Sequence, residues 1–235
     1  MTFETTVREG ICQLRRADTR WLSTAWDGGY ERADAGYNVT VPTEFDRTDL
    51  DAYRAERLGA AGFHVGPTLL TGVHMDNARR ARDGPVTVVA TAGLSNPAVL
   101  PVGGAGSDSG GAGDGAETAA WRPGTVNLLV GVERALDDGA LATLLATAVE
   151  AKTATLRTLA GVPGTTSDAV LVGTAPDCEP AAFAGSATEV GAAARACVRD
   201  AVAASLDSHY EDGPPAPAAT DHGVVTDRQT DVDRP

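Results

Sequence analysis

Lysine is almost absent from this chain. Of its 19 basic residues only Lys152 is a lysine, and the others are arginines. Against them stand 32 acidic residues, which gives a formal net charge of −13. A surface this acidic repels phosphate backbones and anionic lipid headgroups, so we expect neither a nucleic-acid partner nor membrane binding. The single lysine, kept between Glu150 and Thr153, is therefore a candidate for chemistry.

Cysteines and long apolar runs are also scarce. Cys12, Cys178 and Cys197 are far apart and odd in number, which excludes a disulfide framework and a C-x-x-C metal motif. A reducing cytoplasm is the simplest compartment for such a chain. No run approaches the roughly 20 apolar residues of a membrane helix, and the N-terminus lacks the pattern of a signal peptide.

Aromatic residues make up only 5% of the chain, and four of them fall close together in its first part. Trp21, Trp26, Tyr30 and Tyr37 could line a wide apolar binding site. They could equally form most of the N-terminal core. The sequence leaves both possibilities open.

The order of the expected elements indicates an α+β (mixed α/β) fold in a single domain of residues 1–210. The N-terminal half is rich in strands and the C-terminal half alternates strand, helix, strand and helix, so we predict a mixed sheet layered with helices. The expected strands are 3–7, 11–14, 21–26, 38–41, 85–91, 124–132 and 168–174, and the expected helices are 48–58, 139–159 and 186–208.

Two segments lie outside this pattern. An insert near 103–118 is almost wholly Gly, Ala, Ser and Asp, and residues 211–235 have few apolar side chains. Such compositions bury too little apolar surface to offset the entropy of ordering. We therefore expect a disordered surface loop and a disordered acidic tail.

Helical spacing separates the two charged residues of the longest expected helix. Its apolar positions, which include Leu141, Leu144 and Leu156, form one stripe at 100° per residue, and Lys152 falls at the centre of that stripe. Glu150 points almost the opposite way. We therefore expect Lys152 to point inward and treat Glu150 as the weaker candidate.

Polar residues gather near the expected strand ends, as in Asn96, Thr174 and Asp177. In open α/β sheets ligands bind at the carboxyl ends of strands, which favours a site there. Asn127 lies inside an apolar strand, where its amide needs several hydrogen-bond partners.

Four polar motifs occur in an order that resembles the adenosylcobinamide amidohydrolase family. They are Thr91-Ala-Gly-Leu-Ser95-Asn96, Gly124-Thr125-Val-Asn127, Glu150-Ala-Lys152-Thr153 and Gly173-Thr174-Ala-Pro-Asp177. Weaker companions are Ser23-Thr24, Gly28-Gly29 and Thr71-Gly72. The resemblance covers roughly residues 20–205. Pro176 departs from it, because a polar residue such as threonine is expected there.

The resemblance implies hydrolysis of the amide between the corrin side chain and aminopropanol of adenosylcobinamide. The products would be adenosylcobyric acid and 1-amino-2-propanol. It implies no cofactor, since cobalt enters with the corrinoid substrate. A non-catalytic corrinoid- or nucleotide-binding protein is the alternative. The acidic, lysine-poor composition is similar to that of proteins from salt-loving archaea, and a homo-oligomer is possible.

Amide hydrolysis requires a nucleophile, a base, oxyanion donors and a proton for the leaving amine. Glu150 or Asp177 could be the base, and Lys152 could stabilise the oxyanion or donate the proton. Water is favoured as the nucleophile over a side-chain hydroxyl, because no serine–histidine arrangement is evident. The expected substrate-binding residues are Thr91, Ser95, Asn96, Thr125, Asn127, Thr153 and Thr174.

No catalytic metal is expected, because His64 and His74 have no carboxylate or cysteine at a recognisable metal-ligand spacing. Whether either histidine contacts substrate stays open.

Overall fold

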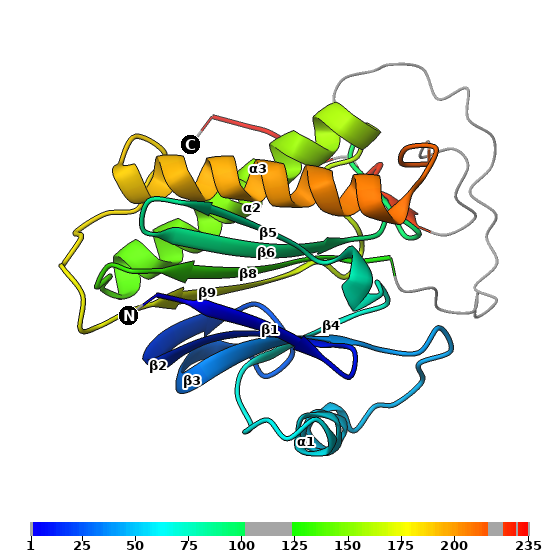
Figure 1. Cartoon of the computed structure of the whole chain (residues 1–235). Coiled ribbons are helices and arrows are strands. Elements are labelled where there is room, and N and C mark those ends of the chain that lie inside the picture. Colours follow the sequence, from blue (N-terminus) through cyan, green and yellow to red (C-terminus); the bar gives the residue numbers. More distant parts are fainter. Residues whose placement is uncertain (1, 102–123, 216–222, 229, 235) are drawn as a thin grey trace.

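A strongly bent mixed sheet, covered on one face by two long helices, forms the framework of the protein (Figure 1). The structure is a computed structural model that describes residues 2–101, 124–215, 223–228 and 230–234. Its main sheet runs in the order β4-β3-β2-β9-β8-β6-β5, with β1 paired to β2. The predicted mixed α/β class is therefore confirmed. The predicted insert near 103–118 lies wholly outside the described residues.

The elements follow the chain in this order. The strands are β1 (Glu4–Arg8), β2 (Ile11–Ser23), β3 (Gly29–Thr40), β4 (Thr68–Thr71), β5 (Arg79–Asp83), β6 (Val86–Ala92), β7 (Ala98–Val99), β8 (Val126–Val132), β9 (Ala169–Thr174) and β10 (Val224–Val225). The helices are α1 (Leu50–Ala60), the short 3₁₀ helix η1 (Met75–Asn77), α2 (Asp138–Ala160) and α3 (Glu189–His209).

The sheet bends at β2. This strand pairs with β3 along most of its length but with β9 only over Arg20–Ser23, and its register shifts between Arg15 and Thr19. Asp18, inside the shift, has a φ of +52°, which lets the strand turn sharply. Strands β1–β4 therefore fold back beneath β6, β8 and β9, and the two layers face each other (Figure 1).

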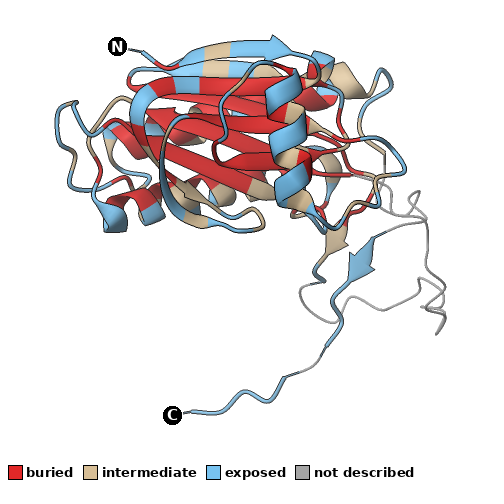
Figure 2. Cartoon of the chain, turned by 90° about the horizontal axis from the view of Figure 1, so that it is seen from below, coloured by how far each residue is buried: buried red, intermediate tan, exposed pale blue. Residues whose placement is uncertain are grey.

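Two glycines allow the layers to approach. A Cβ on Gly131 of β8 would lie 2.6 Å from the Phe3 ring, and one on Gly173 of β9 would lie 2.5 Å from the Trp21 ring. Trp21 is fully buried at this contact. Figure 2 shows that much of the sheet is buried as well. Gly131 and Gly173 are therefore required by close packing, since their φ angles are ordinary.

Helices α2 and α3 bury the other face of β5, β6, β8 and β9. Asp137 caps α2, because its carboxylate accepts a hydrogen bond of 2.7 Å from the Ala140 N–H, and Gly161 ends the helix with a φ of +72°. Helix α3 begins later than the predicted residue 186. Thr188 is the cap, and its hydroxyl accepts from the Gly191 N–H at 3.0 Å.

Several strand predictions need correction. β3, predicted over 38–41, begins at Gly29, and β4 and β7 were not predicted. The run 11–14 and the start of the run 21–26 belong to one long strand, because β2 continues through the bend and ends at Ser23. β5 was missed because its sequence, Arg-Arg-Ala-Arg-Asp, is that of a charged edge strand. Within the predicted tail, β10 pairs in parallel with β7.

Candidate active site

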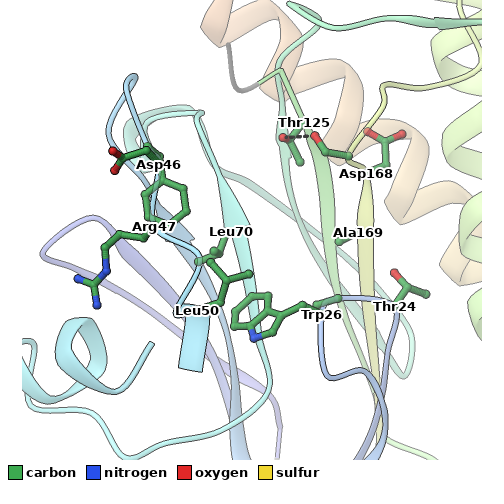
Figure 3. A pocket seen from close by; sticks show the side chains of 12 residues that line it. Thr24, Trp26, Asp46, Arg47, Leu50, Leu70, Thr125, Asp168 and Ala169 are labelled. Atoms are coloured by element: carbon green, nitrogen blue, oxygen red, sulfur yellow. Dashed lines mark hydrogen bonds between the residues drawn. The ribbon is translucent and has the colours of Figure 1, made fainter. Parts of the chain in front are cut away.

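A pocket of about 530 Å³ opens between the bend of the sheet and the loop that leads into α1 (Figure 3). Figure 3 shows Thr125, Asp168 and Thr24 on one wall and Asp46, Arg47 and Leu50 on the other. The lining residues are Thr24, Ala25, Trp26, Phe45, Asp46, Arg47, Leu50, Leu70, Thr125, Ser167, Asp168 and Ala169.

The pocket lies at the amino ends of β8 and β9, whereas the sequence favoured a site at the carboxyl ends of strands. Thr125 directly precedes β8, and Ser167 and Asp168 directly precede β9. Because β2 runs antiparallel to β9, the loop that follows β2 reaches the same edge and supplies Thr24 and Trp26.

Lys152 is turned into the protein, as predicted, and is paired with a carboxylate beside the pocket. Its Nζ forms an ion pair with Asp168 Oδ2, and the two side chains are only 7% and 11% exposed. A Cβ on Gly164 would lie 2.5 Å from Asp168 Oδ2 and 3.2 Å from Lys152 Nζ. Only a glycine at position 164 leaves room for this pair.

Asp168 receives three more hydrogen bonds. Its Oδ1 accepts from the Val126 N–H at 2.8 Å and from the Thr165 hydroxyl at 2.5 Å, and its Oδ2 accepts from the Thr165 N–H at 3.1 Å. Each carboxylate oxygen therefore has two donors. Asp168 ties α2 to the segments that enter β8 and β9, and it has little capacity left to accept a proton.

Hydroxyl groups stand next to this ion pair. Thr125 Oγ1 and Ser167 Oγ are 3.1 Å apart, which is the dashed line at Thr125 in Figure 3. The Ser167 hydroxyl also donates to the Gly124 carbonyl at 3.3 Å. Thr125 is buried while Ser167 is exposed. The predicted residue Thr125 is thus at the pocket, with Ser167 as an additional hydroxyl.

Asn127 has the several partners that its buried amide requires. Its Nδ2 donates to Asn38 Oδ1 at 3.0 Å and to the Leu70 carbonyl at 2.8 Å, and its Oδ1 accepts from the Ala169 N–H at 3.1 Å. Asn38 donates in turn to the Thr91 hydroxyl at 2.8 Å. These groups join the two layers behind the pocket.

Ser95 and Asn96 lie at the same edge. A Cβ on Gly124 would collide with the backbone nitrogens of Ser95 and Asn96, so these two segments are in close contact. The Thr166 N–H donates to the Asn96 carbonyl at 3.0 Å. The structure therefore gathers the first two predicted motifs around the entry to β8 and β9.

The fourth motif lies at the opposite end of β9. The Thr174 hydroxyl accepts from the Leu136 N–H at 2.8 Å and donates to the Arg134 carbonyl at 2.6 Å, which anchors the loop into α2. Asp177 is exposed and pairs with buried Arg16 at 2.7 Å. The hydrogen bond from Arg16 lowers the pKa of the Asp177 carboxyl below its usual value.

Thr153 is half-buried in α2 and does not line the pocket. The predicted set Thr153, Thr174 and Asp177 is thus not brought to this site.

Glu150 points to solvent and pairs with Arg195 of α3, as its helical position indicated. The two side chains are 63% and 37% exposed, so the pair stabilises little. We expect Glu150→Gln to leave corrinoid turnover within about twofold of the parent, because an exposed charge far from a site has small effects. Steady-state rates at fixed salt measure this. A tenfold loss would return Glu150 to the candidate bases.

The four aromatic residues divide between core and surface. Trp21 and Tyr37 are buried in two separate parts of the core. Trp26 is half-buried at the pocket and Tyr30 is 46% exposed. Only Trp26 and Tyr30 can therefore take part in binding. His64 and His74 are exposed and do not line the pocket.

Sequence reasoning missed Asp168, Ser167 and Asn38. The signal for Asp168 was present, because a lysine buried in a helix needs a carboxylate partner. The Thr165-Thr166-Ser167-Asp168 run, directly before a buried strand, offered one. Asn38 could not be found from the sequence, because its partners Thr91 and Asn127 belong to distant strands that meet only in the folded sheet.

Within the described residues there is no group of three His, Cys, Asp or Glu side chains placed to hold a metal ion. Among the described residues, no helix is long and apolar enough to cross a membrane.

The structure is that of a single-domain α/β protein with a candidate small-molecule pocket lined by hydroxyls and by Asp168, the carboxylate that pairs with buried Lys152. The family model described as adenosylcobinamide amidohydrolase matches residues 2–214. The chain belongs to this family.

Two relatives of the same description agree with this membership. An adenosylcobinamide amidohydrolase of Halobacterium salinarum is 52% identical over 236 residues, which cover 99% of this chain and 100% of that protein. One of Methanosarcina mazei is 27% identical over 207 residues, or 83% and 94% of the two chains. The PH0078 protein of Pyrococcus horikoshii OT3 shows a distant structural likeness, with a TM-score of 0.42 and 11% identity over 88% of this chain and 80% of that chain.

Proposed function

We propose that this protein hydrolyses the amide bond between the corrin side chain and aminopropanol of adenosylcobinamide. The observation that carries this assignment is the family match over residues 2–214, with 52% identity to a curated enzyme of that name. In the reaction water adds to the carbonyl carbon, the C–N bond breaks, and the amine leaves with a proton. The products are adenosylcobyric acid and 1-amino-2-propanol.

The pocket suits the reacting side chain of such a substrate. Pockets of roughly 300–1,000 Å³ enclose ligands of drug size, and an adenosylated corrinoid is considerably larger. A pocket of about 530 Å³ would hold the side-chain amide, while the corrin ring lies across its mouth. Neutral hydroxyls such as Thr24, Thr125 and Ser167 match the neutral amide and alcohol of that side chain.

Lys152 is our candidate for the electrostatic part of the chemistry. Its ammonium group carries three N–H donors, and one of them is used by Asp168. A further N–H could stabilise the oxyanion or supply the proton of the leaving amine. Lys152 itself does not line the pocket, so Asp168, which does, would hold the ammonium group directly behind the pocket wall.

The base must be sought among carboxylates other than Glu150 and Asp177, which lie away from the pocket. Asp46 and Asp168 line it. Asp168 already accepts four hydrogen bonds, whereas Asp46 is exposed on the opposite wall. We therefore favour water as the nucleophile, with Asp46 as its base. A route through the hydroxyl of Ser167 or Thr125 is the alternative.

We further propose that the enzyme works without a cofactor, that cobalt enters with the substrate, and that the setting is a cytoplasm of high salt. The acidic composition and the likeness to a protein of Halobacterium salinarum support the salt requirement. The reaction itself needs only water.

The direct test is incubation of the full chain with adenosylcobinamide at high salt. We expect release of 1-amino-2-propanol, detected as its amine, together with a corrinoid that has gained one carboxylate. Folding is checked in the same buffer by circular dichroism. A folded protein that binds the corrinoid and releases no amine would overturn the proposal.

A further inference from the structure

A second cavity of about 220 Å³ adjoins the first, and Trp26 lines both. We call it the Arg54 subsite. It lies between the β2–β3 connection, α1 and the segment that enters β4. Its lining residues are Ser23, Trp26, Asp27, Gly28, Gly29, Tyr30, Glu31, Arg54, Pro67 and Thr68. A ligand that crosses Trp26 would therefore reach both cavities.

Arg54 supplies hydrogen-bond donors that the protein does not fully use. Its Nη2 pairs with Asp51 at 2.9 Å, and its guanidinium lies over the Trp26 ring at 5.9 Å from the centroid. Its Nε is buried and has no hydrogen-bond partner among the described residues. That N–H has almost no accessible surface, so a ligand acceptor would meet the guanidinium where the side chain, which is 17% exposed, lines the cavity.

The charges around Arg54 select the kind of acceptor. Asp27 and Glu31 line the same cavity, and Asp51 already balances the arginine. A phosphate or carboxylate would face these carboxylates and be repelled. A neutral group that both accepts and donates, such as a carboxamide, can use the arginine and a carboxylate together.

The turn at Gly28, which lines the cavity, is closely packed. A Cβ on Gly28 would lie 2.5 Å from the Ser23 carbonyl oxygen and 2.7 Å from that of Ala25. Trp26 is fixed further by a hydrogen bond of 3.3 Å from its Nε1 to Asp51. The wall shared by the two cavities is thus held by the same carboxylate that pairs with Arg54.

We propose that the Arg54 subsite binds a peripheral carboxamide of the corrinoid while the first pocket holds the amide that is cleaved. This rests on the proposed function, since a corrin ring carries several carboxamide side chains around its rim. Trp26 lies between the two groups and supports the ring face. Arg54 then determines how firmly the corrinoid is held and takes no part in bond cleavage.

Steady-state kinetics of Arg54→Met with adenosylcobinamide test this. We expect KM to rise about tenfold with kcat within about twofold of the parent, as for a lost charged hydrogen bond to bound substrate. Arg54→Lys, which keeps the charge beside Asp51, should also raise KM. The matched control is Arg8→Met, because Arg8 stacks on Phe63 and lines neither cavity.

Titration with adenosylcobyric acid, which retains the peripheral carboxamides, separates this inference from the proposed function. A parent that binds it more tightly than both Arg54 variants supports the subsite even if no amide is cleaved. Equal affinity in the folded parent, Arg54→Lys and Arg54→Met would overturn the subsite, whatever the turnover of the parent.

Discussion

Lys152→Met should lower the turnover of adenosylcobinamide by about 100-fold, the usual loss when one donor to a developing oxyanion is removed. It should also lower the free energy of unfolding by about 3 kcal/mol, because Asp168 keeps its charge in a site with little access to solvent. Turnover is measured by amine release and stability by urea unfolding at the same salt concentration.

The two effects are separable by a second substitution. Combining Lys152→Met with Asp168→Asn removes both charges while the amide oxygen can still accept from the Val126 N–H and the Thr165 hydroxyl. We expect this double variant to recover much of the lost stability, since a buried pair replaced by neutral groups is often tolerated. Turnover should stay low.

A double variant that regains both stability and the parent's turnover would show that Lys152 is a structural residue only. Asp168→Asn alone adds a further check. It should impair turnover less than the lysine variant does, because the ammonium group remains near the pocket without its anchor.

Asn127→Leu should destabilise the protein by about 4 kcal/mol or prevent folding. The leucine would leave Asn38 Oδ1, the Leu70 carbonyl and the Ala169 N–H without their partner, and each unpaired buried group costs about 1–3 kcal/mol. Urea unfolding followed by circular dichroism measures the change. The loss of stability should be the same with and without substrate.

A double-mutant cycle with Asn38→Leu tests the network itself. Asn38 and Asn127 share a hydrogen bond of 3.0 Å, so their combined cost should be smaller than the sum of the two single costs. Strict additivity would mean that the two amides contribute independently. A folded Asn127→Leu protein of normal stability that has lost corrinoid binding would instead restore this residue to the substrate contacts.

Local sequence patterns predicted the helical layer and its inward lysine well. The apolar stripe of α2 has the helical period, and β6, β8 and β9 are nearly uninterrupted buried runs, so burial shows in both patterns. Lys152 could be placed because it falls on the stripe that includes Leu144, Ala148 and Leu156. These features depend only on residues close together in the sequence.

The site itself depended on contacts between distant segments. Asp168 and Ser167 form the pocket only because β9 starts beside the loop that follows β2. Thr174 and Asp177 belong to the same ordered set of motifs but lie at the far end of β9. Spacing along a strand does not reveal which end of the sheet another segment will cover, since that is decided by the bend of β2.

The bend has a consequence for how the chain is made. Val170 of β9 donates to Thr24 across 146 positions of sequence, so the N-terminal layer pairs with a strand synthesised long after it. Contacts of such separation slow folding, because a long loop must close before they form. During synthesis β1–β4 are made before β9, so the edge of β2 that pairs with β9 stays unpaired for that time. Unpaired strand edges favour association with other chains. We expect refolding at low protein concentration to give a markedly higher yield than refolding at high concentration.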